Sequence, residues 1–352
     1  MPRRIECAGG GHVAVMHLPE PRGPLSEGLG RDLATRTTLS ATTIERADRV
    51  AAGRAGALTD EDLQLSLAIC YELHYRGFDG TSDDWEWDPV LIRLRSALER
   101  RHLAALRRLA GPVTTTDEPI DRQLAAVIAA DDGPSLSAYL AKYGTLEQWR
   151  EYLTLRSVYH LKEGDPHTFA VPRLSGRAKA AMVEIQADEY GGGVAQRMHS
   201  ELFAGLMRSL GLDATYGALW NDAPAPAFAS VNTMSLFGLH RRWRAAAAGH
   251  LTAVEMTSSE PSRRYSTGLK RLGFAERTTV FYDEHVEADA VHEQIAAVDM
   301  CGSLVADDPS LRADVLFGAA CALAVDALAA TDLLAAWEAG RSGLRAPARP
   351  AA

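Results

Sequence analysis

Strand-like alternation of polar and apolar residues is almost absent from this sequence, and this constrains the fold more than any other feature. A half-buried strand needs a side-chain period of two over at least four residues. The few β-branched clusters, such as residues 278–281, are too short to build a sheet. Long stretches instead repeat their apolar residues at helical spacing, with Gly or Pro between them. The sequence therefore predicts an all-α fold.

Helix boundary signals divide the chain into four parts. Gly and Pro are frequent in residues 1–30, which predicts an extended or poorly ordered lead-in. Residues 31–115 predict an N-terminal helical extension. Residues 116–345 predict a larger helical domain, in which one long helix covers 231–259 and a shorter one 261–273. The low-complexity tail, residues 346–352, predicts disorder.

Capping residues support the helices of the extension. Thr59 and Asp60 can cap a helix that begins at an acidic turn. A later helix has Pro89 in its first turn and Gly111 at its end, which are the positions where proline and glycine are favoured. The segment 111–119, GPVTTTDEP, then separates the extension from the larger domain.

Charge and cysteine usage exclude several classes of function. The chain has 352 residues, 47% of them hydrophobic, and a formal net charge of −9, which argues against a nucleic-acid partner. We find no continuous apolar run of about 18 residues and no signal peptide, so we expect no membrane partner. The four cysteines form no CxxC pair. Reduced thiols in a cytoplasmic protein are the expected reading.

One segment carries a pattern suited to chemistry. In residues 281–296, FYDEHVEADAVHEQIA, the side chains of His285, Asp289 and His292 stand at positions i, i+4 and i+7. On a helix they span about 60° of the circumference, while other acidic side chains of the segment project to the opposite side. Histidine and carboxylate ligands without a thiolate suit iron or manganese, and less uniquely zinc. The stripe therefore predicts one wall of a metal site.

A site with two metal ions needs further ligands from facing helices. Spacing alone does not choose among the remaining acids and histidines. The candidates are His160, Glu163, His167, Glu184, Asp188, Glu189, His199, Glu201, His240, His250 and Glu255.

These residues, in their order along the chain, resemble the haem-oxygenase-like di-iron oxidases and oxygenases, also described as iron-containing redox enzymes. The signature of that family is a helix with H-x3-D-x2-H, preceded by a glutamate on the previous long helix and, further upstream, by a glutamate and a histidine. A branch that oxygenates amine nitrogen has one more carboxylate, which Glu163 matches. The resemblance covers roughly residues 120 to 340. It implies the metal ligands Glu163, Glu189, His199, Glu255, His285, Asp289 and His292.

The resemblance also implies a fold and an activity. The expected fold is a seven-helix, haem-oxygenase-like bundle with an N-terminal helical extension that some members use for dimer contacts, so we expect a homodimer. The expected cofactor is a pair of iron ions without haem, with O2 as co-substrate. N-oxygenation of an amine, guanidine or amino-acid nitrogen is the first reading. Oxidative C–C cleavage or desaturation of an amino or fatty acid is the alternative. The reaction is also compatible with an external electron donor. A helical binding or scaffold protein with a relict metal site is the competing class.

Two further features allow alternative readings. On an unbroken helix Glu189 and His199 would lie about 80° apart, so the glycines 191–193 either bend the chain to bring them to one site or only separate two helices. Arg263 and Arg264 follow Pro261. They could hold a substrate carboxylate, or form surface ion pairs.

Overall fold

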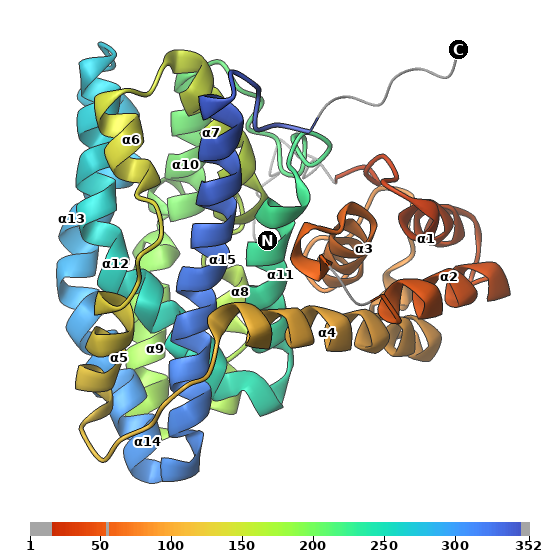
Figure 1. The fold of residues 1–352 in the computed structure, drawn as a ribbon, viewed down its shortest axis with the longest axis horizontal. Helices are drawn as coiled ribbons and strands as arrows, with labels where there is room; N and C mark the ends of the chain where they lie inside the picture. The colour runs from red at the N-terminus through yellow and green to blue at the C-terminus, as the bar shows by residue number, and fades with distance from the viewer. Residues whose placement is uncertain (1–15, 54–55, 346–352) are drawn as a thin grey trace, which may run out of the picture.

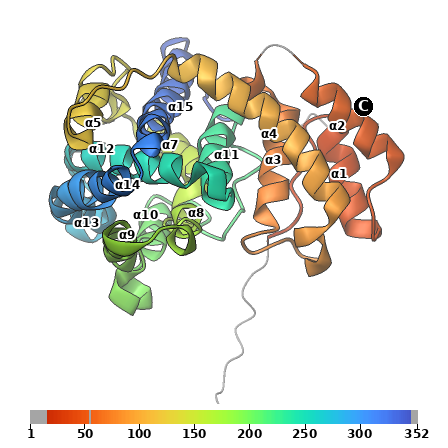
Figure 2. The same ribbon diagram turned by 90° about the horizontal axis from the view of Figure 1, so that it is seen from below.

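The computed structural model describes residues 16–53 and 56–345, apart from the side chains of residues 289 and 290. Within these ranges the chain forms helices and no strand, which confirms the all-α prediction. Figures 1 and 2 show two parts: a large bundle formed by the later helices and a smaller group of N-terminal helices beside it. Helix α4 runs from the smaller group to the bundle. The bundle contains the candidate site, and the smaller group is the predicted extension.

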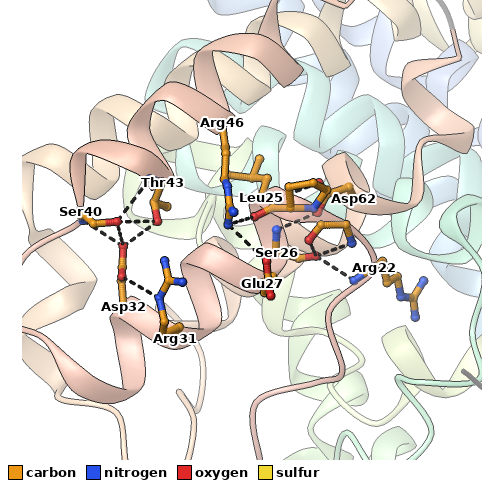
Figure 3. A network of polar contacts seen from close by, with 12 residues as sticks. Arg22, Leu25, Ser26, Glu27, Arg31, Asp32, Ser40, Thr43, Arg46 and Asp62 are labelled. Atoms are coloured by element: carbon orange, nitrogen blue, oxygen red, sulfur yellow. Dashed lines mark hydrogen bonds and ion pairs between the residues drawn. The ribbon is translucent and has the colours of Figure 1, made fainter. Parts of the chain in front are cut away.

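The N-terminal extension begins earlier than the sequence suggests. Helix α1 starts at Pro24, so the prediction of an extended segment is wrong for residues 24–30, while residues 1–15 lie outside the described part. The carboxylate of Asp62, on α3, accepts hydrogen bonds from the backbone N–H groups of Leu25 (2.8 Å) and Ser26 (2.7 Å) (Figure 3). A distant residue thus satisfies the start of α1. The extension comprises α1 (Pro24–Thr35), α2 (Ala41–Ala51), α3 (Glu61–Glu72) and α4 (Pro89–Ala110).

A second carboxylate, that of Asp32, joins α1 to α2. Asp32 is fully buried and accepts hydrogen bonds from the hydroxyl groups of Thr43 (2.6 Å) and Ser40 (2.8 Å) (Figure 3). Burial acts to raise the pKa of Asp32, but these hydrogen bonds outweigh it and lower the pKa.

The predicted caps of α3 and α4 are confirmed. The side chain of Asp60 accepts a hydrogen bond from the N–H of Leu63 at the start of α3. Pro89 occupies the first position of α4, and Gly111 follows its last residue with a φ of 70°. Only glycine adopts this left-handed conformation without strain.

The bundle is built from short and long helices joined by tight turns. They are α5 (Ile120–Ala129), α6 (Leu136–Lys142), α7 (Leu146–His160), α8 (Asp165–Thr168), α9 (Gly176–Glu189), α10 (His199–Ser209), α11 (Ala225–Leu239), α12 (Arg244–Arg271), α13 (Glu276–Gln294), α14 (Ser303–Asp307) and α15 (Arg312–Glu338). Between α13 and α14 the chain forms a π-helix over Ile295–Gly302.

Helices α12 and α15 pack with their backbones almost in contact. A Cβ atom placed on Gly249 would lie 1.9 Å from the carbonyl oxygen of Val315, and one on Gly318 would lie 2.0 Å from that of Ala246. No other residue type fits at either position. Helix α15 is also long and apolar enough to cross a membrane, contrary to our expectation, but half of its apolar window is buried. Its packing on α12 identifies it as a core helix of the bundle.

The predicted helix over 231–259 is interrupted. The side chain of Arg173 donates hydrogen bonds to the backbone carbonyls of Gly238 and Leu239, which ends α11 there, and His240 is extended. By contrast, Pro261 lies inside α12, so the helix predicted over 261–273 is the end of a longer one. Packing of this segment against α13 outweighs the missing proline N–H.

Candidate metal centre

Helix α13 directs its two histidines into the bundle. His285 and His292 are buried, with 8% and 2% of their surfaces exposed. The backbone of Asp289 belongs to α13, but its side chain lies outside the described part of the chain. The π-helix that follows the stripe is a form often found next to functional sites. Both histidines of the stripe are therefore buried in the bundle, and the orientation of Asp289 stays a prediction.

Four of the predicted ligands form a first group, which we call group 1: Glu163, Glu189, His199 and His285. One ligand atom from each of Glu163, His199 and His285 lies within 4.8 Å of the other two. Glu189 joins them because its Oε2 is 3.0 Å from Nδ1 of His199. All four side chains are buried. They come from the turn after α7, the end of α9, the start of α10 and the middle of α13.

Glycines make this convergence possible. Gly164, with a φ of 86°, lies so close to α9 that a Cβ there would be 3.2 Å from Cβ of Glu189. Gly191, with a φ of 62°, would place a Cβ 2.6 Å from the backbone of Arg197. The chain therefore turns back on itself between α9 and α10. The glycine run both ends a helix and brings Glu189 and His199 to one site.

Two of the other predicted ligands, Glu255 and His292, form a second group with Asp188, which we call group 2. Nδ1 of His292 is 3.3 Å from Oε2 of Glu255, and its Nε2 is 2.9 Å from Oδ2 of Asp188. Glu255 is buried on α12, whereas the side chain of Asp188 is 58% exposed. Asp188 precedes Glu189 directly, so the end of α9 supplies one carboxylate to each group.

The hydrogen bonds of the histidines fix which nitrogen is available to a metal. The Nδ1–H of His285 donates to the backbone carbonyl of Phe281 at 2.6 Å, because a carbonyl can only accept. Its Nε2 then faces Oε1 of Glu163 at 3.8 Å. Donation from Nε2 of His292 to Asp188 would likewise leave Nδ1 toward Glu255. A carboxylate or carbonyl behind the imidazole is the usual arrangement at metal sites.

Buried polar atoms in group 1 fit a cation. Oε2 of Glu163, Oε2 of Glu189 and Nδ1 of His199 are buried and make no hydrogen bond. The close pair of Glu189 and His199 therefore directs a carboxylate oxygen and an imidazole nitrogen toward one point. Buried carboxylates are costly unless a cation neutralises them. Oxygen and imidazole donors without sulfur suit iron. The residues present thus fit an iron site.

Neighbouring groups shift the pKa values of two ligands of group 1, Glu163 and His199. Burial acts to raise the pKa of Glu163, but His160 and His285 outweigh it and hold this pKa well below its usual range. Burial acts to lower the pKa of His199, yet the carboxylate of Glu189 raises it above the ordinary value. Glu163 is therefore a carboxylate at neutral pH.

Three supporting residues, His160, Arg156 and Asp188, were not assigned to the site from the sequence. The Nδ1–H of His160 donates to Oε1 of Glu163 at 2.7 Å, and the Nε–H of Arg156 donates to the other nitrogen of His160 at 3.1 Å. Asp188 supports His292 in the same way. The available signal was local: His160 stands three residues before Glu163, and Asp188 stands beside Glu189.

Other candidates lie elsewhere. Glu184 and Glu201 are exposed. His240 contacts Glu99 at 3.0 Å, and His167 contacts His250 at 3.1 Å. Each of these three histidines therefore contacts a residue outside the two ligand groups.

The arginines proposed to hold a substrate form surface ion pairs. Arg263 and Arg264 both contact the carboxylate of Glu260, at 3.2 and 3.1 Å. Arg264 also donates to the hydroxyl of Ser135. These contacts match the surface ion-pair reading, and the binding of a substrate carboxylate stays a prediction.

Comparison with protein families agrees with this geometry. A family model described as iron-containing redox enzyme matches residues 150–327, just over half of the chain. The chain belongs to this family. The match begins within α7 and ends within α15, so it includes both ligand groups and leaves out the N-terminal extension. No curated protein matches the chain.

Proposed function

We propose that this iron-containing redox enzyme is a non-haem di-iron oxygenase that uses O2 on a small molecule. The observation that carries the proposal is the presence of two groups of carboxylates and imidazoles, mostly buried, to each of which the end of α9 supplies one carboxylate. Group 1 would hold one iron ion and group 2 the other, with Asp289 as a further ligand. Bound iron would supply the one-electron chemistry through which ground-state O2 reacts.

We further propose N-oxygenation of an amine, guanidine or amino-acid nitrogen. Glu163 supports this reading because its carboxylate belongs to group 1, with His199 and His285 within 4.8 Å. It is the additional carboxylate that the amine-oxygenating branch has. Oxidative C–C cleavage or desaturation of an amino or fatty acid remains the alternative, and a scaffold protein with a relict metal site is the competing class.

The chain itself orients the ligands and excludes water. His160 and Arg156 hold the carboxylate of Glu163 from behind, and the carbonyl of Phe281 holds the ring of His285. The ring of Phe281 packs against the rings of His160 and Phe203, at centroid distances of 5.3 and 5.1 Å. This apolar wall removes water from one side of group 1. Fixed ligands in a dry pocket limit the reorganisation that a reaction requires.

Anaerobic iron loading tests the proposal. The full chain is titrated with ferrous iron and then exposed to O2 with a panel of amines, guanidines, amino acids and fatty acids. We expect two iron ions per chain, O2 uptake, and hydroxylamine or nitro products. Alkene or aldehyde products would favour the alternative. Iron well below one ion per chain without O2 uptake would favour the scaffold.

Variants make the same experiment specific to the site. His285→Ala and Glu163→Gln should each lower the bound iron to about one ion per chain. His240→Ala is a matched control, because His240 contacts Glu99 rather than the candidate ligands. Two bound iron ions in both site variants would contradict the assignment of group 1.

We also propose a cytoplasmic homodimer that contacts its partner copy through the N-terminal extension. The extension lies beside the bundle and outside the family match, so it is available for such a contact (Figure 1). Light scattering of the full chain would contradict the dimer if it gave the mass of a monomer. Comparison of O2 uptake with and without an added electron donor would show whether the enzyme requires one.

A further inference from the structure

Four redox-active aromatic side chains pack together beside group 1. Trp149 and Tyr152 belong to α7, Tyr265 to α12 and Tyr282 to α13. The ring of Tyr265 lies 5.0 Å from those of both Tyr152 and Tyr282, measured between centroids. Trp149 lies 6.0, 5.8 and 6.3 Å from Tyr152, Tyr265 and Tyr282. We call these four residues the aromatic cluster. Tyrosine and tryptophan are among the side chains that lose an electron most readily.

The inner end of the aromatic cluster reaches the candidate ligands. Tyr282 stands three residues before His285 on α13, and its ring is 5.1 Å from that of Phe281. Phe281 in turn lies 4.6 Å from the ring of His285 and 6.5 Å from that of His199. One phenyl ring therefore separates the cluster from two ligands of group 1.

The outer end reaches the surface. Trp149, Tyr152 and Tyr282 are buried, whereas Tyr265 is half-buried. The guanidinium of Arg156 faces the three phenols and is one-third exposed. It pairs with the exposed carboxylate of Asp326 at 2.9 Å. The cluster thus runs from the metal groups to solvent.

The hydroxyl groups are the unusual part of this packing. Phenylalanine would fill the same volume, and burial of a hydroxyl is unfavourable by about 1–3 kcal/mol unless it is compensated. The hydroxyls of Tyr265 and Tyr282 both interact with that of Tyr152. Burial raises the pKa of all three, so each phenol keeps its proton at neutral pH. A core that needed only apolar volume would not place three phenols around one arginine.

We propose that Tyr282, Tyr152 and Tyr265, with Trp149, form a relay that carries oxidising equivalents from the metal centre to the surface when O2 reacts without substrate. The inference rests on the proposed function, because O2 activated at the iron is the oxidant. Reduction of O2 to two water molecules takes four electrons and four protons. Two ferrous ions supply two electrons. Two tyrosines supply the other two electrons and, by breaking their O–H bonds, two protons. Solvent supplies the remaining two protons.

The relay then requires a reductant from outside. The two holes pass outward one after the other to Tyr265, the half-buried member. For each hole, a one-electron donor of the thiol or ascorbate class returns one electron and a proton from solvent restores the O–H bond, so two donor molecules are oxidised per O2. The buried ligands of group 1 are thereby spared oxidation during a turnover that has no substrate.

A substrate-free turnover tests the relay. The iron-loaded full chain is mixed with O2 without substrate or reductant, frozen for electron paramagnetic resonance, and mapped by peptide mass spectrometry for oxidised tyrosine. We expect a tyrosyl radical and oxidation at Tyr265. Tyr282→Phe should lower the oxidation of Tyr265 at least fivefold at equal iron content. Tyr71→Phe, at a buried tyrosine of the extension bonded to Glu99, should leave it unchanged. Equal oxidation of Tyr265 in wild type and Tyr282→Phe would overturn the relay.

A photochemical arm separates the relay from the proposed function. A soluble ruthenium(III) polypyridyl oxidant, generated by a light flash, is applied to the metal-free chain. Tyr265, the partly exposed member, should pass the hole inward, so that Tyr282 becomes oxidised in wild type and at least fivefold less in Tyr265→Phe. Absence of O2 uptake in the iron experiment would refute the proposed function alone. Oxidation of Tyr282 that does not depend on Tyr265 would refute the relay.

Discussion

A buried ion pair connects the N-terminal extension to the turn that carries Glu163. Lys162 is 3% exposed, and its Nζ lies 2.8 Å from Oε2 of Glu72, the fully buried last residue of α3. The hydroxyl of Tyr216 donates to the same carboxylate at 2.8 Å. The ammonium group also lies 4.1 Å from the ring centre of Tyr75. We predict that Lys162→Met destabilises the protein strongly, because the buried carboxylate then keeps neutral donors, the phenol of Tyr216 and the backbone N–H of Arg76, without the ammonium group.

The magnitude follows from burial. Removal of one partner from a buried pair costs about 3–5 kcal/mol. A surface pair contributes about 0–1 kcal/mol, and Arg177 with Asp299 is such a pair, with side chains 71% and 35% exposed. Arg177→Met is therefore the matched control. Replacement of both buried partners, Lys162→Met with Glu72→Leu, should recover most of the loss, since no isolated charge remains.

Urea unfolding followed by circular dichroism measures these differences. Lys162→Met should lower the free energy of unfolding by about 3 kcal/mol or more, and the double variant by less than half of that. It should also weaken iron binding, because Glu163 is the next residue. A loss below about 1 kcal/mol in Lys162→Met, equal to that in Arg177→Met, would refute the reasoning.

Three further predictions concern backbone geometry and protons. Gly191→Ala should weaken iron binding and lower the free energy of unfolding, because its Cβ would meet the backbone. Gly192→Ala, with a similar φ of 61° and open space around it, should lower the free energy of unfolding by only about 1–2 kcal/mol and keep its iron. Iron content and urea unfolding compare the two variants. His102 is buried, and burial lowers its pKa to about 4, below an unfolded value near 6.5. The free energy of unfolding should therefore fall by about 2 kcal/mol between pH 7 and pH 5. His102→Gln should lack this loss in the same unfolding assay. The raised pKa of His199 means that its pair with Glu189 stabilises the metal-free chain below about pH 6.5 and that this stabilisation disappears as the pH rises through the folded value. Because iron needs the neutral imidazole, calorimetric titration should show affinity rising from pH 6 to pH 8 with proton release, and a flat profile would contradict the assignment of His199 as a ligand.

Local patterns were sufficient for the helices and for one wall of the site. The caps of α3 and α4 depend on residues within one turn, and the spacing of His285 and His292 is a property of a single helix. Contacts between distant segments were not accessible in this way. Asp62 caps α1 from α3, and Arg173 ends α11 by taking its last carbonyls.

The choice among candidate ligands illustrates the same limit. Spacing could not separate Glu189 from Glu184 or Glu201, because all three are ordinary helix residues. The resemblance selected Glu189, and the turn at the glycines explains why it reaches His199. His160 and Asp188 support ligands through contacts that only the folded chain reveals.

The crossing of α12 and α15 at Gly249 and Gly318 has a consequence for how this enzyme can change. Side chains at an ordinary helix interface can adopt other rotamers and let two helices shift, but here backbone meets backbone. Glu255 lies on the same helix, six residues beyond Gly249, so the backbone that carries this candidate ligand has little room to shift along α15. Adaptation to a new substrate would then begin with changes of side chains and not with a movement of these two helices.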